Sequence, residues 1–234
     1  MKKWRTSKQT TVWKLLSLRC NCYVLEKNHK FILVDTSMGF DRYLIRLQLK
    51  RIGARTLDAI YITHVHKDHV GNAAYFQKKF ECPVYVDQLE YNFMVKGFSE
   101  VPKGTSRYTR CLTKIMDRKN FFIQFEPVKF VKVFKDKCHM EELKENLSFI
   151  RLAGHTRGSI SIIIDDEIAL VGDTMSYRGD TIYPSFADCK EELKQSWQKL
   201  LCLRCLIYLP GHGKQITRKD INKSLCNLKN NLIF

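Results

Sequence analysis

The chain has 234 residues, of which 44% are hydrophobic and 27% are charged, and its formal net charge is +16. These proportions are ordinary for a globular protein and exclude a disordered or collagen-like chain. No apolar run approaches the roughly 20 residues of a membrane span, and the basic excess favours anionic partners, although a solvated basic surface explains it equally well.

The first residues resemble no export signal. A basic start is followed by the polar run 6–11, where a signal peptide would have an apolar core and a small-residue cleavage site. The nine cysteines are an odd number without framework spacing, which favours reduced thiols. We therefore expect a cytoplasmic protein with no membrane partner.

The first part of the chain predicts strands that alternate with helices. Apolar runs typical of buried strands occur at 31–34, 57–63 and 83–86. Spacings typical of helices occur between them, at 41–52 and 68–80. Gly53 follows the first helix as its expected C-terminal cap.

The pattern changes over residues 87–118. Helical spacing at 90–94 and again at 109–118 is interrupted by the breaker-rich run 101–106. This segment predicts a helical lid or insert near the substrate. A plain helical pair that covers one sheet is an equally good interpretation.

The remaining chain predicts a second group of strands and two helices. Strands are expected at 128–134 and 148–152, and a hairpin joins 159–164 to 168–171 across an acidic turn. An amphipathic helix over 190–203, a strand over 206–209 and a closing helix over 219–234 complete the chain. Two groups of strands with helices between them predict a layered α/β or α+β fold.

The strongest chemical signal is a His-x-His-x-Asp-His motif between a predicted strand and a predicted helix. Its four potential metal ligands are His64, His66, Asp68 and His69. His64 and His66 point to the same side of an extended strand end, because side chains alternate there. Imidazole nitrogens and carboxylate oxygens suit zinc and similar divalent ions, so four such groups at this spacing predict a metal site.

Three further candidates each end a predicted strand and have a glycine neighbour. His155 lies in Gly-His-Thr, Asp173 in Gly-Asp-Thr and His212 in Pro-Gly-His-Gly. Glycine lets the backbone bend sharply at a crowded site.

The order of these four motifs resembles the metallo-β-lactamase fold superfamily over residues 35–213. The resemblance implies an α+β fold, a four-layer αββα sandwich with metals at one edge between two sheets, and we expect one domain over 1–234. It implies two metal sites that share a bridging ligand. The implied ligands of the first site are His64, His66 and His155, those of the second are Asp68, His69 and His212, and the implied bridge is Asp173. Asp35 matches a family aspartate that orients a ligand histidine; local turn bonds are the alternative role.

The resemblance also implies the cofactors and the chemistry. We expect two divalent ions, Zn²⁺ first and Fe or Mn otherwise, about 3.5–4 Å apart and sharing a hydroxide that attacks a carbonyl or phosphoryl centre. Asp68 and Asp173 would also accept or relay the proton. Asp173, as a bridging aspartate, resembles the bridging aspartate of glyoxalase II-type thioesterases, lactonases and phosphodiesterases. Zinc β-lactamases lack this aspartate.

We therefore expect a hydrolase for a small anionic ester, thioester, lactone or phosphodiester. Tyr177 and Arg178, which follow Asp173 in the chain, are candidate substrate contacts. Tyr177 lies four residues after Asp173, whereas lactonases of the family have a tyrosine three residues after their bridging aspartate. A solvated or structural role for Arg178 is equally plausible.

Two alternatives stay open. Persulfide dioxygenases of the same superfamily carry the same early histidine motif but use one iron held by two histidines and an aspartate. A nuclease acting on nucleic acid would use the basic charge and aromatics such as Tyr91, Phe93 and Tyr108, and its RNA affinity would fall steeply with salt. Nucleic acid is the less favoured partner.

Overall fold

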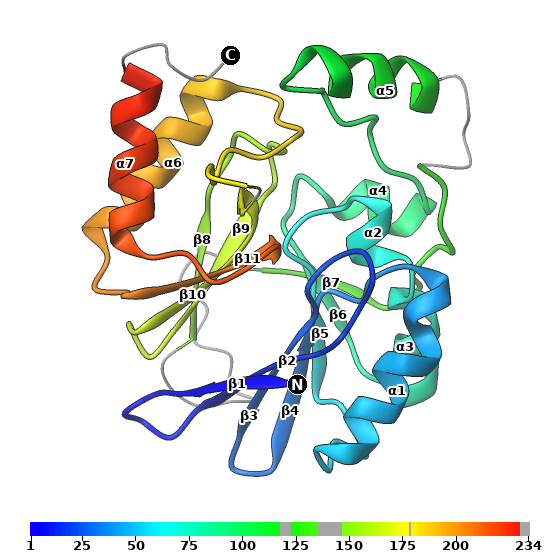
Figure 1. Ribbon diagram of the computed structural model, residues 1–234. Helices are drawn as coiled ribbons and strands as arrows, with labels where there is room; N and C mark the ends of the chain where they lie inside the picture. Colours follow the sequence, from blue (N-terminus) through cyan, green and yellow to red (C-terminus); the bar gives the residue numbers. More distant parts are fainter. Residues whose placement is uncertain (118–122, 135–146, 178, 230–234) are drawn as a thin grey trace.

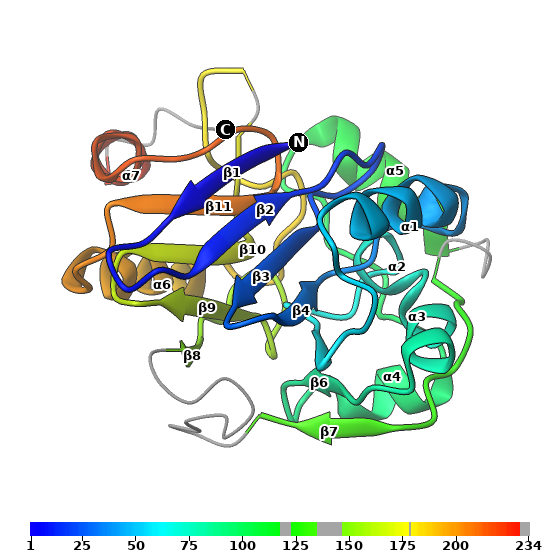
Figure 2. The same cartoon turned by 90° about the horizontal axis from the view of Figure 1, so that it is seen from below.

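The computed structural model describes residues 1–117, 123–134, 147–177 and 179–229. Two β-sheets pack face to face in it, and helices cover the outer face of each sheet (Figures 1 and 2). This is the four-layer αββα sandwich that the sequence predicts. No helix among the described residues is long and apolar enough to cross a membrane.

The described residues form one seven-stranded and one four-stranded sheet. In the first sheet β1 to β4 are antiparallel neighbours and β4 to β7 run parallel. The second sheet has the order β11-β10-β9-β8, and only β10 and β11 run parallel. The strands are β1 Lys2–Arg5, β2 Thr11–Lys14, β3 Tyr23–Lys27, β4 Lys30–Val34, β5 Ala59–Tyr61, β6 Val84–Val86, β7 Val131–Val133, β8 Leu147–Arg151, β9 Ile160–Ile164, β10 Ile168–Ser176 and β11 Ile207–His212.

The helices divide between the two outer layers. Helices α1, α3 and α4 pack on the first sheet, and α6 and α7 pack on the second. Their bounds are α1 Arg42–Arg51, α2 Lys67–Val70, α3 Ala73–Phe80, α4 Tyr91–Lys96, α5 Arg107–Asp117, α6 Lys190–Cys202 and α7 Arg218–Lys229, with a 3₁₀ turn η1 at Gly39–Asp41 before α1.

The alternation of side chains along each strand separates the cores. In β4, Ile32 and Val34 enter the core between the two sheets, where they join Ile162 of β9. Leu33 points the other way and packs with Ile45 of α1. Because successive strand residues face opposite sides, a continuously apolar strand such as β4 must be covered on both faces, which accounts for the four layers.

The helix expected over 68–80 is split into α2 and α3. Asn72 lies between them and donates through Nδ2 to the carbonyl oxygens of Thr36 and Met38. A Cβ at Gly71 would lie 2.8 Å from the carbonyl oxygen of Ser37. Tertiary contact with this backbone therefore interrupts a helix that local spacing alone makes continuous.

The hairpin predicted around the acidic turn is present. Strands β9 and β10 are antiparallel neighbours. Asp165 and Asp166 both have positive φ, 54° and 59°, which is the requirement of a type I′ turn. Strand β10 continues beyond the expected end at residue 171, so Asp173 lies inside a strand.

The N-terminal hairpin of β1 and β2 ties the first sheet to the second. Trp4 Nε1 donates to Gln215 Oε1 at 2.9 Å, and Thr6 Oγ1 donates to Asp165 Oδ2 at 2.5 Å. These contacts join residues that are more than 150 positions apart in the chain.

The segment 87–118, whose last residue lies outside the described part, is anchored at two places. Met94 in α4 is fully buried in the core under the first sheet. Further along, the Thr105 amide donates to Ser185 O and the Ala187 amide donates to Lys103 O. The segment therefore begins as part of the core and continues as a flank of the loop after β10; its role as a lid stays a prediction.

Candidate metal centre

The seven candidate ligands meet where the two sheets end. The motif from His64 to His69 joins β5 to α2, His155 follows β8, and Asp173 and His212 belong to β10 and β11. Their donor atoms form three overlapping groups, each within 4.8 Å. The groups are His64 with His66 and His155, His64 with His69 and Asp173, and Asp68 with His69 and His212.

The first group is a buried cluster of three imidazoles. His155 Nε2 lies 3.1 Å from His64 Nε2 and 3.0 Å from His66 Nδ1. Ligand atoms about 2.0–2.1 Å from a tetrahedral ion would be about 3.3 Å apart, so this separation fits one metal ion. Burial lowers the pKa of all three imidazoles, that of His66 to about 3, which keeps their lone pairs free for a metal.

The second group places two carboxylates among imidazoles. His212 Nε2 lies 3.3 Å from both Asp68 Oδ2 and Asp173 Oδ2. Burial opposes the ionisation of both carboxyl groups, but His212 and His69 hold their pKa values below the usual range. The first group therefore offers neutral imidazoles and the second offers ionised carboxylates, a donor set suited to divalent cations.

Asp173 lies between the two groups. Its Oδ1 is 3.5 Å from His69 Nε2, and its Oδ2 is 3.8 Å from His155 Nε2. Among the described residues, His69 Nε2 and Asp173 Oδ1 are both buried without a hydrogen-bond partner. Buried polar atoms rarely remain unpaired, so a cation between these atoms fits the site.

Asp35 forms hydrogen bonds with His69 and with Thr63, the residue before His64. Its Oδ2 lies 2.8 Å from His69 Nδ1 and accepts a hydrogen bond from Thr63 Oγ1, while its Oδ1 accepts from the Thr63 amide. Thr63 Oγ1 lies 3.1 Å from His64 Nδ1. Although burial works against protonation, Asp35 and Asp173 raise the pKa of His69 to about 9. These contacts occupy Nδ1 of His69 and of His64, while Nε2 of each lies beside another candidate ligand. This arrangement suits the orienting role expected of Asp35, which stays a prediction.

Two glycines allow the backbone to approach the ligands. A Cβ at Gly211 would lie 2.3 Å from Asp173 Oδ1 and 2.6 Å from His69 Cε1. Gly172 has a φ of +50°, and its Cβ would lie 2.8 Å from Thr63 Oγ1. Only glycine fits at both positions without displacing ligands or their support.

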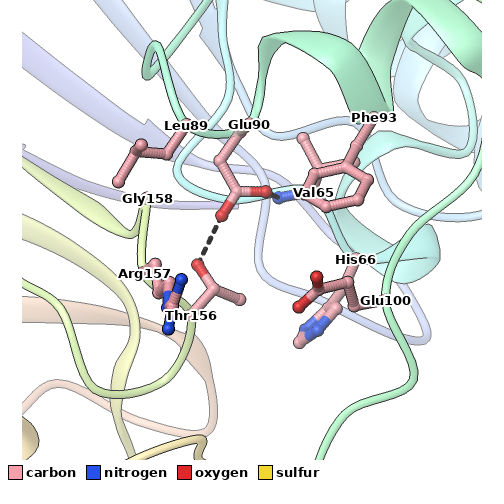
Figure 3. A pocket seen from close by; sticks show the side chains of 9 residues that line it. All are labelled: Val65, His66, Leu89, Glu90, Phe93, Glu100, Thr156, Arg157 and Gly158. Atoms are coloured by element: carbon pink, nitrogen blue, oxygen red, sulfur yellow. Dashed lines mark hydrogen bonds between the residues drawn. The ribbon is translucent and has the colours of Figure 1, made fainter.

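Glu90 is a buried carboxylate at the site that sequence reasoning missed. Its Oε1 accepts from Thr156 Oγ1 at 2.6 Å and its Oε2 accepts from the Val65 amide at 3.2 Å (Figure 3). It therefore links the loop of His64 and His66 to the loop of His155. The only sequence signal is an acid before a short helix, which does not distinguish this role from a solvated helix end.

A pocket of about 180 Å³ lies beside His66 (Figure 3). Its lining mixes apolar and charged side chains, namely Val65, His66, Leu89, Glu90, Phe93, Glu100, Thr156 and Arg157, with Gly158. Arg157 and Glu100 are exposed, so charges of both signs border the pocket.

The two expected substrate contacts are not tested by this arrangement. The Tyr177 amide donates to His212 O, and Lys214 Nζ lies 4.3 Å from the centre of the Tyr177 ring. Arg178 lies outside the described residues. Substrate contact by either residue stays a prediction.

Comparison with known proteins identifies the family of the chain. Residues 17–212 match the family model of the metallo-beta-lactamase superfamily. The chain is 29% identical over 213 residues to the uncharacterized protein ML0493 of Mycobacterium leprae, covering 86% of this chain and 89% of that protein. It is 27% identical over 214 residues to the probable metallo-hydrolase YqgX of Bacillus subtilis, covering 89% and 93%.

The fold is also found in solved structures. The crystal structure of TTHA1623 in a di-iron-bound form superposes with a TM-score of 0.65 at 20% identity, covering 91% of this chain and 97% of the other. At this identity the likeness shows the fold alone. The family model spans most of the chain and all seven candidate ligands, so the protein belongs to the metallo-beta-lactamase superfamily.

Proposed function

We propose that the protein is a hydrolase that uses two divalent ions, Zn²⁺ first among them, to cleave a small anionic ester, thioester, lactone or phosphodiester. The observation that carries the proposal is that two buried atoms, His69 Nε2 and Asp173 Oδ1, have no hydrogen-bond partner among the described residues and lie within a cluster of seven donor side chains. We include in the proposal a cytoplasmic location, supported by the free thiols of the eight described cysteines.

The proposed ligands form two metal sites. His64, His66 and His155 would hold one ion, Asp68, His69 and His212 the other, and Asp173 both. Bound divalent ions supply Lewis acidity and make water acidic enough to ionise near neutral pH.

Asp68 is suited to proton transfer. Its side chain is 34% exposed, whereas that of Asp173 is 12% exposed. Asp68 therefore faces both the centre and solvent, and its ionised carboxylate can accept a proton and pass it outward. Asp173, more enclosed, would mainly hold its neighbours in place.

The pocket beside His66 is the proposed substrate site. Leu89 and Phe93 provide apolar walls, and the exposed guanidinium of Arg157 borders it. A small molecule with an apolar part and an anionic group fits these surroundings. The net charge of +16 supports capture of an anion.

The test is the metal content of the purified protein, by elemental mass spectrometry, together with turnover of thioesters, lactones and phosphodiesters. We expect about two zinc or manganese ions per chain, and we expect His66→Ala to lose metal and turnover. His29→Ala, which changes an exposed histidine remote from the motifs, is the control.

Other results would contradict the proposal. Undiminished turnover in His66→Ala would exclude the metal mechanism. One iron per chain, with oxygen consumption on a persulfide, would indicate a dioxygenase. RNA affinity that falls steeply with salt, together with RNA cleavage, would indicate a nuclease.

A further inference from the structure

Five large apolar side chains are exposed together beside the first sheet. They are Leu16 (59% exposed), Leu18 (77%), Phe40 (57%), Tyr43 (65%) and Leu47 (46%), and we call them the apolar surface. They make up five of the twelve large apolar side chains that the described residues expose. Single exposed apolar residues are ordinary, but a contiguous group indicates an interaction site.

Hydrogen bonds hold the two parts of the apolar surface side by side. The Leu16 amide donates to Gln48 Oε1 at 2.7 Å, and Gln48 Nε2 donates back to Leu16 O at 2.9 Å. The Leu18 amide donates to Asp41 Oδ2 at 3.0 Å. The loop 15–22 therefore lies beside η1 and α1, as the view from below shows (Figure 2).

Helix geometry places the other three residues on one stripe. With about 100° between successive residues, Phe40, Tyr43 and Leu47 fall on one side of η1 and α1. Ile45 and Leu49 are fully buried on the opposite side. Gln48, which contacts the loop, lies between the two sides, so the loop borders the exposed stripe.

The two segments that carry the apolar surface are strongly basic. Between residues 14 and 22 and between 38 and 57 the chain has one acidic residue, Asp41, and its carboxylate is buried and bonded to Ser37 and Leu18. The same ranges contain seven basic residues, which are Lys14, Arg19, Arg42, Arg46, Lys50, Arg51 and Arg55.

We propose that the apolar surface docks on a lipid bilayer that contains anionic lipids. Apolar side chains beside a basic rim match the requirements of interfacial binding, because the former enter the headgroup region and the latter attract anionic lipids. A symmetric contact with a second copy would place the same cations, Arg46 and Lys50 among them, close together. This proposal departs from the sequence expectation of no membrane partner.

Docking would also orient the metal centre. Asn21, in the same loop, donates from its amide to Gly211 O at 2.6 Å and from Nδ2 to Pro210 O at 2.8 Å. The docked loop is thus bonded to the strand end that carries His212. The proposal goes beyond the hydrolase function and does not depend on it.

The test is co-sedimentation of the metal-loaded, 234-residue chain with vesicles. Vesicles of phosphatidylglycerol mixed with phosphatidylcholine are compared with vesicles of phosphatidylcholine alone, at low and at high salt. We expect binding to the mixed vesicles that weakens with salt, and an affinity at least about tenfold lower in the double variant Leu18→Ser/Leu47→Ser.

Matched variants separate docking from general effects. Leu206→Ser changes a leucine that is 68% exposed outside the apolar surface and should bind like the unchanged protein. Arg46→Glu/Lys50→Glu should lose binding, whereas Lys199→Glu, on exposed α6 surface, should lose far less. Circular dichroism and metal content verify that each variant is folded.

Three results would overturn the proposal. They are no binding to the mixed vesicles, equal binding by the Leu18→Ser/Leu47→Ser and Leu206→Ser proteins, and a stable dimer in sedimentation that Leu47→Ser dissociates. None of these measurements uses substrate turnover, so failure here and failure of the hydrolase proposal are distinguishable.

Discussion

Replacing Gly211 with alanine should disable the metal centre through a single methyl group. The new Cβ would lie 2.3 Å from Asp173 Oδ1, although real Cβ contacts stay above 3.0 Å, so the carboxylate or the strand must move by about 0.7 Å. Metal–ligand distances tolerate about 0.2 Å. We expect metal affinity to fall about 10–100-fold and stability to fall by about 1–3 kcal/mol from overpacking.

The assay is chelator competition for the bound metal, with thermal unfolding measured in parallel. Gly39→Ala is the matched control, because a Cβ at Gly39 meets nothing within 4 Å. If Gly211→Ala retains metal as tightly as Gly39→Ala does, the close approach at Gly211 does not constrain the centre, and the reasoning from the geometry is wrong.

Three further changes test the support of the centre. Asp35→Asn removes the charge behind His69 and should weaken metal binding about 10–100-fold in chelator competition, while Asp166→Asn, in the exposed turn, should leave it unchanged. Burial raises the pKa of Glu90 in the folded protein. The contribution of Glu90 to the free energy of unfolding is therefore greatest below the usual carboxyl pKa, and it declines as the pH rises through the raised pKa of the folded state. Denaturant unfolding at several pH values should therefore show that decline in the unchanged protein and lose it in Glu90→Gln; equal pH dependence would contradict the cause assigned to the shift. Metal removal should lower the melting temperature, because ions that bind only the folded state stabilise it, and a melting temperature unaffected by chelator would show that the ions contribute nothing to stability.

Much of the fold follows from local patterns in the chain. The apolar runs around Ile32 and Ile162 identify strands because each must be buried on both faces. The pair Asp165 and Asp166 marks a hairpin because aspartate tolerates positive φ. The first ligand motif is recognisable because four potential metal ligands lie between His64 and His69, a spacing that packing alone does not require.

Other features depend on contacts that no local pattern contains. Asn72 interrupts a helix only because the backbone of residues 36–38 lies within its reach. Glu90 joins two ligand loops only because α4 packs beneath them. Strands β1 and β2 are short and mostly polar, so their pairing is determined by their partners more than by their own residues.

The bonds between the N-terminal hairpin and the second sheet also bear on biosynthesis. Trp4 and Thr6 leave the ribosome well before their partners Gln215 and Asp165. At about 5–20 residues per second, translation from Trp4 to Gln215 takes on the order of ten to forty seconds. Until β8 to β11 have been made, the strands of the first sheet have no second sheet to cover their inner face. Nascent chains are therefore exposed to aggregation until late in synthesis, and the yield of folded protein should rise with chaperones that shield this face.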